Sequence, residues 1–317
     1  MTGAASARLR LRVPLPAPLQ PLNRPRYPLG VPKKERMTIA IGMLYDNGAL
    51  LGADSLVTTG TLGSYESKIL GYRIDGADVI FALAGNVDLA DSAWQLCEPA
   101  VLKHAGKKST AREIAASLRS VLAKEYKEQV IDCGYVGSQY DYSFLIAIRP
   151  EGSKAELYCT YSKALKKSRG GREHIGAGAD LAKLLLSWIR PSLLSAEQLA
   201  ELAAHAIARL KLEMPGVIGG NNLIVILSDD GEILFYRQAD LELLTQYGRA
   251  YDVEARFLLW RFLDSSVDQT KFKESVDCFS RSVIDSRNEW KRERDRIVFS
   301  TPPPEADEAI IDLRTHR

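Results

Sequence analysis

The sequence has few of the residues that build metal sites, disulfide frameworks or membrane spans. Only four cysteines and four histidines occur among its 317 residues, no two cysteines form a CxxC pair, and both residue types are widely scattered. This spacing indicates neither a zinc site nor a disulfide framework. The longest apolar runs, such as residues 182–189, include Lys183 and fall short of the ~18 consecutive apolar residues that a transmembrane helix needs. We therefore expect no metal, no cofactor and no membrane partner.

Positive charge is concentrated at one end of the chain. The formal net charge is +2, but residues 1–36 contain eight Lys or Arg and one acidic residue, Glu35, so that residues 37–317 carry −5. A nucleic-acid-binding domain is usually basic in its folded part. We therefore expect no nucleic-acid partner. The 46% hydrophobic content is enough for one large core or two smaller ones.

The first 36 residues also hold seven of the 14 prolines. Prolines this close together fit neither a helix nor a central strand, so we expect residues 1–37 to be disordered. The segment lacks the apolar stretch of a secretory signal. A propeptide, an Arg-rich targeting leader and upstream sequence that is not normally translated all fit. We favour upstream sequence that is not normally translated, because Met37 begins the first patterned segment. We also expect the protein to be cytoplasmic.

Residues 38–240 repeat one plan, strands followed by helices. Turn signals at residues 46–48 and 229–231 predict two hairpins. Strands followed by bundled helices predict a layered α+β domain rather than alternating βαβ units. The expected strands are 38–44, 49–54, 68–74, 78–84, 142–148, 156–161, 174–176, 222–227 and 232–236, and the expected helices are 89–101, 110–129, 181–190 and 195–212.

The end of the chain has a different composition. Helices are expected at 252–262 and 268–294, within a helical extension that covers residues 241–300. Residues 301–317 contain several prolines and acidic residues and are expected to be a disordered tail. No purpose for this extension follows from the sequence.

A series of short motifs lies between Thr38 and Gly85. Thr38 stands four residues before Gly42 and 16 before Asp54, and Lys68 and the Ala-Gly pair that ends at Gly85 follow in the same order. In this register the sequence resembles a proteasome β-type subunit, a member of the N-terminal-nucleophile (Ntn) hydrolases that include bacterial proteasome-like peptidases. The resemblance continues faintly to about residue 236. It implies a four-layer αββα sandwich, here with an extra C-terminal helical segment.

The resemblance also implies roles for four residues. Thr38 is the nucleophile and, once it is the first residue, its α-amine is the base; Asp54 and Lys68 support it, and the N–H of Gly85 binds the oxyanion. The chemistry is sound, because a threonine hydroxyl needs a nearby base and an α-amine has an ordinary pKa near 8. An adjacent lysine lowers that pKa, and an aspartate holds the lysine in place. Each residue also has an ordinary structural interpretation, as a strand threonine, a turn cap, a solvated lysine or a glycine with positive φ.

The sequence departs from the family pattern at three supporting positions. Where the family has a serine between two glycines this chain has Ala177, and where it has an aspartate and a second serine this chain has Pro215 and Ile218. Loss of such support commonly lowers activity even when the reacting groups are present. The polar residues that stand near enough in the sequence to act as substitutes are Asp180, Glu213 and Asn221.

The function implied by the resemblance is that of a threonine-type endopeptidase. It acts on peptide or protein amide bonds through an acyl-threonine ester, inside a homo-oligomeric ring; an ATPase partner is left undetermined. Two alternatives stay open. One is a catalytically inactive subunit that serves as a scaffold or binding module, and the other is an amidase or acylase of the same nucleophile class that acts on small molecules.

Overall fold

A computed structural model provides the structure of the chain. It describes residues 38–59, 62–65, 67–134, 141–215, 217–236, 238–294 and 310–315. The expected disorder of residues 1–37 and 301–309 concerns residues outside these ranges.

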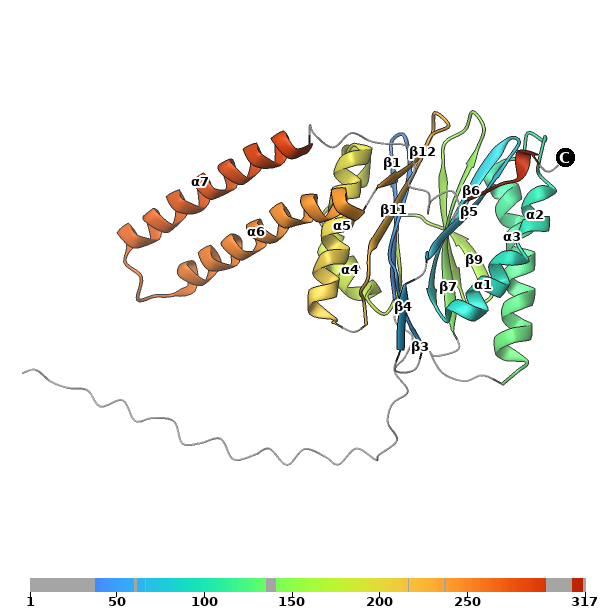
Figure 1. The fold of residues 1–317 in the computed structure, drawn as a ribbon, viewed down its shortest axis with the longest axis horizontal. Helices are drawn as coiled ribbons and strands as arrows, with labels where there is room; N and C mark the ends of the chain where they lie inside the picture. Colours follow the sequence, from blue (N-terminus) through green and yellow to red (C-terminus); the bar gives the residue numbers. More distant parts are fainter. Residues whose placement is uncertain are drawn as a thin grey trace, which may run out of the picture. The chain divides into compact units, whose positions relative to one another are not determined.

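Two β-sheets face each other in the centre of the folded body (Figure 1). Nearly all their strand pairs are antiparallel. The first sheet has the order β10 (Arg172–Gly176), β1 (Ile39–Tyr45), β2 (Gly48–Asp54), β11 (Asn222–Ser228) and β12 (Ile233–Tyr236). The second has the order β13 (Ile310–Asp312), β5 (Ile69–Ile74), β6 (Ala77–Gly85), β7 (Tyr142–Pro150), β8 (Glu156–Tyr161) and β9 (Ala164–Lys167). A separate hairpin consists of β3 (Leu56–Thr59) and β4 (Leu62–Tyr65).

Helices cover the outer face of each sheet. The second sheet is covered by α1 (Val87–Gln95), α2 (Glu98–Leu102) and α3 (Ala111–Tyr126), and the first by α4 (Ala179–Leu186) and α5 (Ala196–Glu213). Capping boxes begin α3 at Thr110 and α5 at Ser195, because each hydroxyl accepts from the backbone three residues later. The predicted four-layer αββα sandwich is therefore confirmed.

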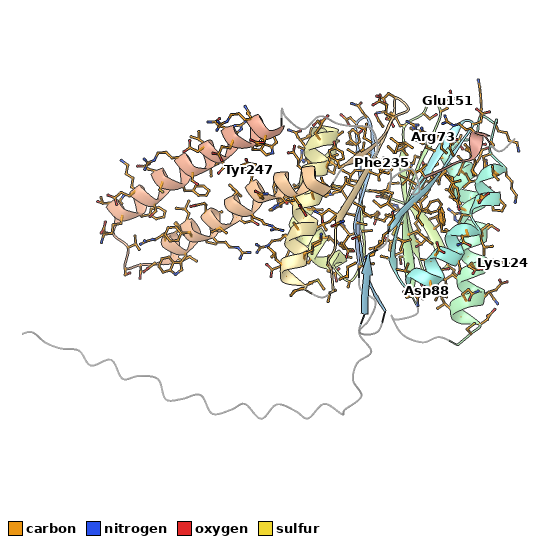
Figure 2. The ribbon with its side chains drawn as sticks, viewed as in Figure 1. Arg73, Asp88, Lys124, Glu151, Phe235 and Tyr247 are labelled. Atoms are coloured by element: carbon orange, nitrogen blue, oxygen red, sulfur yellow. The ribbon has the colours of Figure 1, made fainter. Side chains whose placement is uncertain are left out.

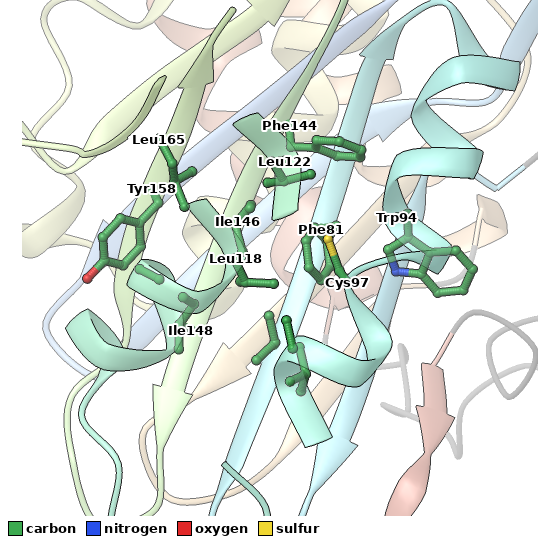
Figure 3. Packing of buried hydrophobic residues seen from close by; sticks show 14 of the residues in the cluster. Phe81, Trp94, Cys97, Leu118, Leu122, Phe144, Ile146, Ile148, Tyr158 and Leu165 are labelled. Carbon is green, nitrogen blue, oxygen red and sulfur yellow. The ribbon is translucent and has the colours of Figure 1, made fainter. Parts of the chain in front are cut away.

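Three apolar clusters hold these layers together. One lies between α1–α3 and the second sheet, where Phe81 and Phe144 pack against Leu118 and Leu122 (Figure 3). A second lies between α4–α5 and the first sheet. The third, between the two sheets, is rich in alanine. Small side chains there let the sheets approach closely, so groups at the strand ends of both sheets can meet.

Several elements differ from the sequence prediction. The helix expected at 89–101 is two helices, α1 and α2, because Pro99 lacks the N–H that would continue the helical ladder. The β3–β4 hairpin and β9 were not predicted. Their strands are only four residues long, too short for a clear alternating pattern.

The tail expected to be disordered is partly structured. Residues 310–312 form β13, which pairs parallel to β5 with Ile310 opposite Gly71. Leu313 follows it and is buried in the cluster under α1–α3. The prediction was wrong for these residues because a strand this short is stabilised by an existing sheet edge and a core contact, which local composition does not reveal.

A pair of long helices, α6 (Gln238–Leu263) and α7 (Gln269–Arg294), follows the sandwich. The helix expected to begin at residue 252 begins instead at Gln238, so the expected boundary at residue 240 falls inside it. Its first turns bury Leu241 in the cluster under α5, and Asp252 lies 3.5 Å from both Arg209 and His205 of α5. Figure 2 shows Tyr247 of α6 in this first half. None of the described helices is long and apolar enough to cross a bilayer.

Candidate active site

The four residues singled out from the sequence lie at the ends of strands. Thr38 directly precedes β1, Asp54 ends β2, Lys68 directly precedes β5, and Gly85 ends β6. The antiparallel register of β1 and β2, with Ala40 opposite Ala53, brings Thr38 to the end of β2. The face-to-face packing of the sheets then brings Lys68 from the second sheet to the same point.

Thr38, Asp54 and Lys68 form one hydrogen-bonded cluster. Thr38 Oγ1 donates to Asp54 Oδ1 at 2.6 Å, and Lys68 Nζ donates to the same oxygen at 2.8 Å. Lys68 Nζ also donates to Thr38 Oγ1 and to the carbonyl of Leu56. The N–H of Ile39 donates to Asp54 Oδ1 at 3.2 Å. One carboxylate oxygen therefore holds both the hydroxyl and the ammonium.

The cluster is removed from solvent. Thr38 is 2% exposed, and Asp54 and Lys68 are 0% exposed. The other carboxylate oxygen, Asp54 Oδ2, accepts from the N–H of Gly219 at 3.0 Å. Lys68 is therefore not a solvated surface lysine and Asp54 is not a simple turn cap, since a buried charge is tolerated only with a partner and hydrogen bonds.

Two glycines at strand ends stand where no side chain fits. Gly85 has a φ of 96°, and a Cβ on it would lie 2.3 Å from the carbonyl oxygen of Asp141. Gly176 has a φ of 93°, and a Cβ on it would lie 2.0 Å from the carbonyl oxygen of Thr38 and 3.3 Å from Ala84 Cβ. Gly176 thus contacts the Thr38 backbone and lies close to Ala84, the residue before Gly85.

The three departures from the family pattern provide no polar side chain at this cluster. Ala177 and Pro215 are exposed, whereas Ile218 is buried in the apolar cluster under α5. Ile218 fills the space above Gly178, where a Cβ would meet its Cδ1 at 2.7 Å. The side chain at position 218 therefore makes apolar contacts.

The substitutes considered from the sequence lie elsewhere or contribute only backbone. Glu213 is exposed and pairs with Arg209 at 2.7 Å, and Asp180 is exposed on α4. Asn221 contributes its N–H, which donates to Ser55 Oγ at 2.8 Å. Ser55 is buried, and its hydroxyl links Asn221 to the end of β2 that carries Asp54.

Sequence reasoning missed Lys211. It lies in the last turn of α5, and its Nζ donates to the carbonyl of Gly220 and to Asn222 Oδ1, both at 2.5 Å. Burial, together with the positive charges of Arg249 and Lys68, lowers its pKa to about 8, although Asp54 and Glu242 favour the charged form. A lysine near a helix C-terminus is common, so no sequence signal distinguishes it.

Comparison with solved structures identifies the fold. The chain superposes on Anbu from Hyphomicrobium sp. strain MC1, a Gly-1 mutant, with a TM-score of 0.58 and 15% identity over 73% of this chain and 98% of that one. For Anbu from Yersinia bercovieri, described as an ancestral beta-subunit, the TM-score is 0.57 and the identity 15%, over 69% and 97% of the two chains. For the helical assembly of the Anbu complex from Pseudomonas aeruginosa the values are 0.56 and 15%, over 73% and 100%.

The chain has the proteasome-like fold of Anbu. The predicted resemblance is confirmed at the level of fold, which is what identities this low can show. No protein-family model matches the sequence, and no curated protein matches it either. Within the described residues, no group of three or more His, Cys, Asp or Glu side chains could hold a metal ion.

Proposed function

We propose that the chain, once it begins at Thr38, is a threonine-type peptidase that cleaves amide bonds in peptides or proteins. The observation that carries this proposal is the buried contact among Thr38 Oγ1, Asp54 Oδ1 and Lys68 Nζ. A buried ion pair commonly stabilises a fold no better than apolar side chains of similar volume. An ion pair that encloses one hydroxyl therefore favours a functional role.

Processing before Thr38 is part of the proposal. In the full chain the nitrogen of Thr38 belongs to the peptide bond with Met37 and is not basic. In the full chain Thr38 is also only 2% exposed. Removal of the preceding residues creates an α-amine, whose neutral form is favoured by the neighbouring Lys68 ammonium.

The proposed reaction proceeds through an acyl ester. The neutral amine of Thr38 takes the proton from Oγ1 as this oxygen bonds to the substrate carbonyl carbon, and the carbonyl electron pair moves to its oxygen. The N–H of Gly85 stabilises that oxyanion, an interaction worth about 3 kcal/mol. The α-ammonium of Thr38 formed in this step then protonates the leaving nitrogen as the C–N bond breaks. Water, deprotonated by the same amine, hydrolyses the ester and restores Thr38.

We also propose that copies of the chain associate and that the protein acts in the cytoplasm. The helical assembly formed by the Anbu complex of Pseudomonas aeruginosa supports association for a protein of this fold. A homo-oligomeric ring with the sites in an enclosed space is the arrangement we favour, and native mass spectrometry measures its size. A monomer or dimer would instead leave Thr38 open and favour the small-molecule amidase or acylase.

The test compares two forms of the protein. One begins at Thr38, released from a cleavable fusion, and the other is the full 317-residue chain. We expect only the first to hydrolyse fluorogenic peptides and to be labelled on Thr38 by a peptide epoxyketone or boronate, as located by peptide mass spectrometry. Thr38→Val, which keeps the shape and removes the hydroxyl, is the control. No labelling and no turnover by the form that begins at Thr38 would contradict the proposal.

A second candidate function is that of an inactive scaffold subunit. It is favoured by the buried, apolar Ile218, which stands where the family has a hydrogen-bonding side chain. The two functions differ in the N-terminus of the protein isolated from its own cells. A free Thr38 supports the peptidase, whereas retention of Met37 or of the preceding residues blocks the amine and supports the scaffold.

A further inference from the structure

A side chain outside the Thr38 cluster reaches the segment that holds Asp54. We call residues 219–222 the Gly219 loop; it leads into β11. Lys211 Nζ donates to the carbonyl of Gly220 and to Asn222 Oδ1, both at 2.5 Å, so it joins the end of α5 to this loop. Asn222 is buried and lies opposite Asp54 in the ladder between β2 and β11.

The Gly219 loop is in turn joined to the strand end that carries Asp54. The N–H of Gly219 donates to Asp54 Oδ2 at 3.0 Å, and its carbonyl accepts from the N–H of Leu56 at 3.2 Å. The N–H of Ser55 donates to the carbonyl of Asn221 at 3.0 Å, and the N–H of Asn221 donates to Ser55 Oγ at 2.8 Å. Displacement of the loop would therefore displace the carboxylate.

The loop has little intrinsic rigidity of its own. It begins with two glycines, which have the greatest backbone freedom of any residue. Gly220 has a φ of 69°, and a Cβ on Gly219 would lie 2.8 Å from Leu56 Cδ2, so larger residues do not fit. The preceding Ile218 is apolar and donates no side-chain hydrogen bond. The ammonium of Lys211 adds two hydrogen bonds that fix the position of the loop.

Burial and the charges around Lys211 bring its pKa close to the ordinary pKa of an α-amine. Its surroundings include Asp54 on β2 and Glu242 on α6, which favour the ammonium, and Lys68 and Arg249, which oppose it. Because burial is the largest influence, the pKa falls to about 8. The charged form prevails at neutral pH and is lost above it.

We infer that Lys211 is a positioning residue for Asp54: it holds the Gly219 loop so that the loop N–H binds Oδ2 and the other oxygen is left to Thr38 and Lys68. Its consequence for reaction rate rests on the proposed peptidase function. The effect of Lys211 on the position of the loop does not rest on that function, because it depends only on the hydrogen bonds.

Hydrogen exchange tests the effect on the loop without any need for activity. We compare the full chain carrying Lys211→Met, which removes the ammonium, with Lys211→Arg, which keeps a cation. Lys124→Met is the control, since Lys124 is exposed on α3 in the other helical layer (Figure 2). At pH 7 we expect amides of residues 219–221 to exchange about tenfold faster in Lys211→Met only, as for loss of one charge-assisted hydrogen bond. Unchanged exchange in a folded Lys211→Met protein overturns the inference.

Kinetics of the enzyme that begins at Thr38 then test positioning. We expect Lys211→Met to lower kcat about tenfold with KM nearly unchanged, and to abolish a decline in rate that the wild type shows above about pH 8. Recovery of most activity in Lys211→Arg supports the role of the charge. Faster exchange of the loop amides with unaltered kcat would overturn the positioning role of Lys211. If the wild type itself is inactive, the peptidase proposal fails, while the exchange comparison still decides whether Lys211 holds the loop.

Discussion

The sandwich encloses a charged pair, whereas the α6–α7 hairpin leaves large apolar side chains exposed. In the sandwich, Asp54 and Lys68 are completely buried as a pair. In the hairpin, Trp260 is 57% exposed and Leu263 70% exposed. A sheet covered on both faces closes a core that can enclose a satisfied ion pair, whereas two helices bury only the strip between them.

Ring contacts link the two helices of the hairpin. Tyr251 packs on Phe279, and Phe262 packs on Phe272, each pair with ring centroids 6.0 Å apart. Even so, Tyr251 is 51% exposed and Phe262 is 67% exposed, close to the 66% of Val253, which lies outside these pairs. Contact between two helices thus leaves much of these aromatic side chains exposed, whereas the layered core encloses Asp54 and Lys68.

The largest expected effect is that of Lys68→Ala. It leaves the carboxylate of Asp54 buried without its ammonium, so we expect the free energy of unfolding to fall by about 3–5 kcal/mol. In the active form we expect kcat/KM to fall by at least about 10²-fold and to lose its rise through the pKa of the Thr38 amine. Urea unfolding and a pH–rate profile measure these changes.

The matched control for this change lies in the hairpin. Lys271 pairs with Asp268 at 3.6 Å, but both side chains are more than half exposed. We expect Lys271→Ala to change stability by less than about 0.5 kcal/mol, because water replaces the lost partner. Equal effects at Lys68 and Lys271 would remove the distinction between the two regions.

The next effect compares the same substitution in both regions. Leu199 of α5 is 0% exposed and Leu263 of α6 is 70% exposed. We expect Leu199→Ala to lower the free energy of unfolding by about 3 kcal/mol through transfer and cavity terms, and Leu263→Ala by less than about 0.5 kcal/mol. Denaturant titration measures both. A large loss at Leu263 would mean that this face of the hairpin is covered in solution.

The effect that is smallest at neutral pH, and that grows only on acidification, concerns a histidine of the sandwich. Burial, with Arg172 and Lys183 nearby, lowers the pKa of His174 to about 4, whereas an unfolded histidine titrates near 6.5. Between these values the unfolded chain binds the extra proton, so stability falls as pH decreases through this window. We expect His174→Gln to make the decline shallower, as measured by urea unfolding at several pH values. Identical slopes for both proteins would contradict this.

Much of the fold was predictable because its signals are local. The hairpin turn at Asp46–Gly48 and the capping box at Ser195 each depend on a few adjacent residues, and both are present in the structure. Local reasoning failed at residues 310–312, whose strand depends on the edge of β5. The break at Pro99 was also missed, although the missing N–H of a proline is itself a local signal.

For the candidate site, the sequence by itself determined the residue types and their order: a threonine before the first strand, an aspartate, a lysine and a glycine at later strand ends. Only the tertiary structure decided that Asp54 Oδ1 binds both Thr38 and Lys68, and that Gly219 and Lys211 complete the support of Asp54. The physical reason is distance along the chain. Turn chemistry and periodicity act over a few residues, whereas the contact between Asp54 and Gly219 joins positions 165 residues apart and exists only once β2 and β11 have paired.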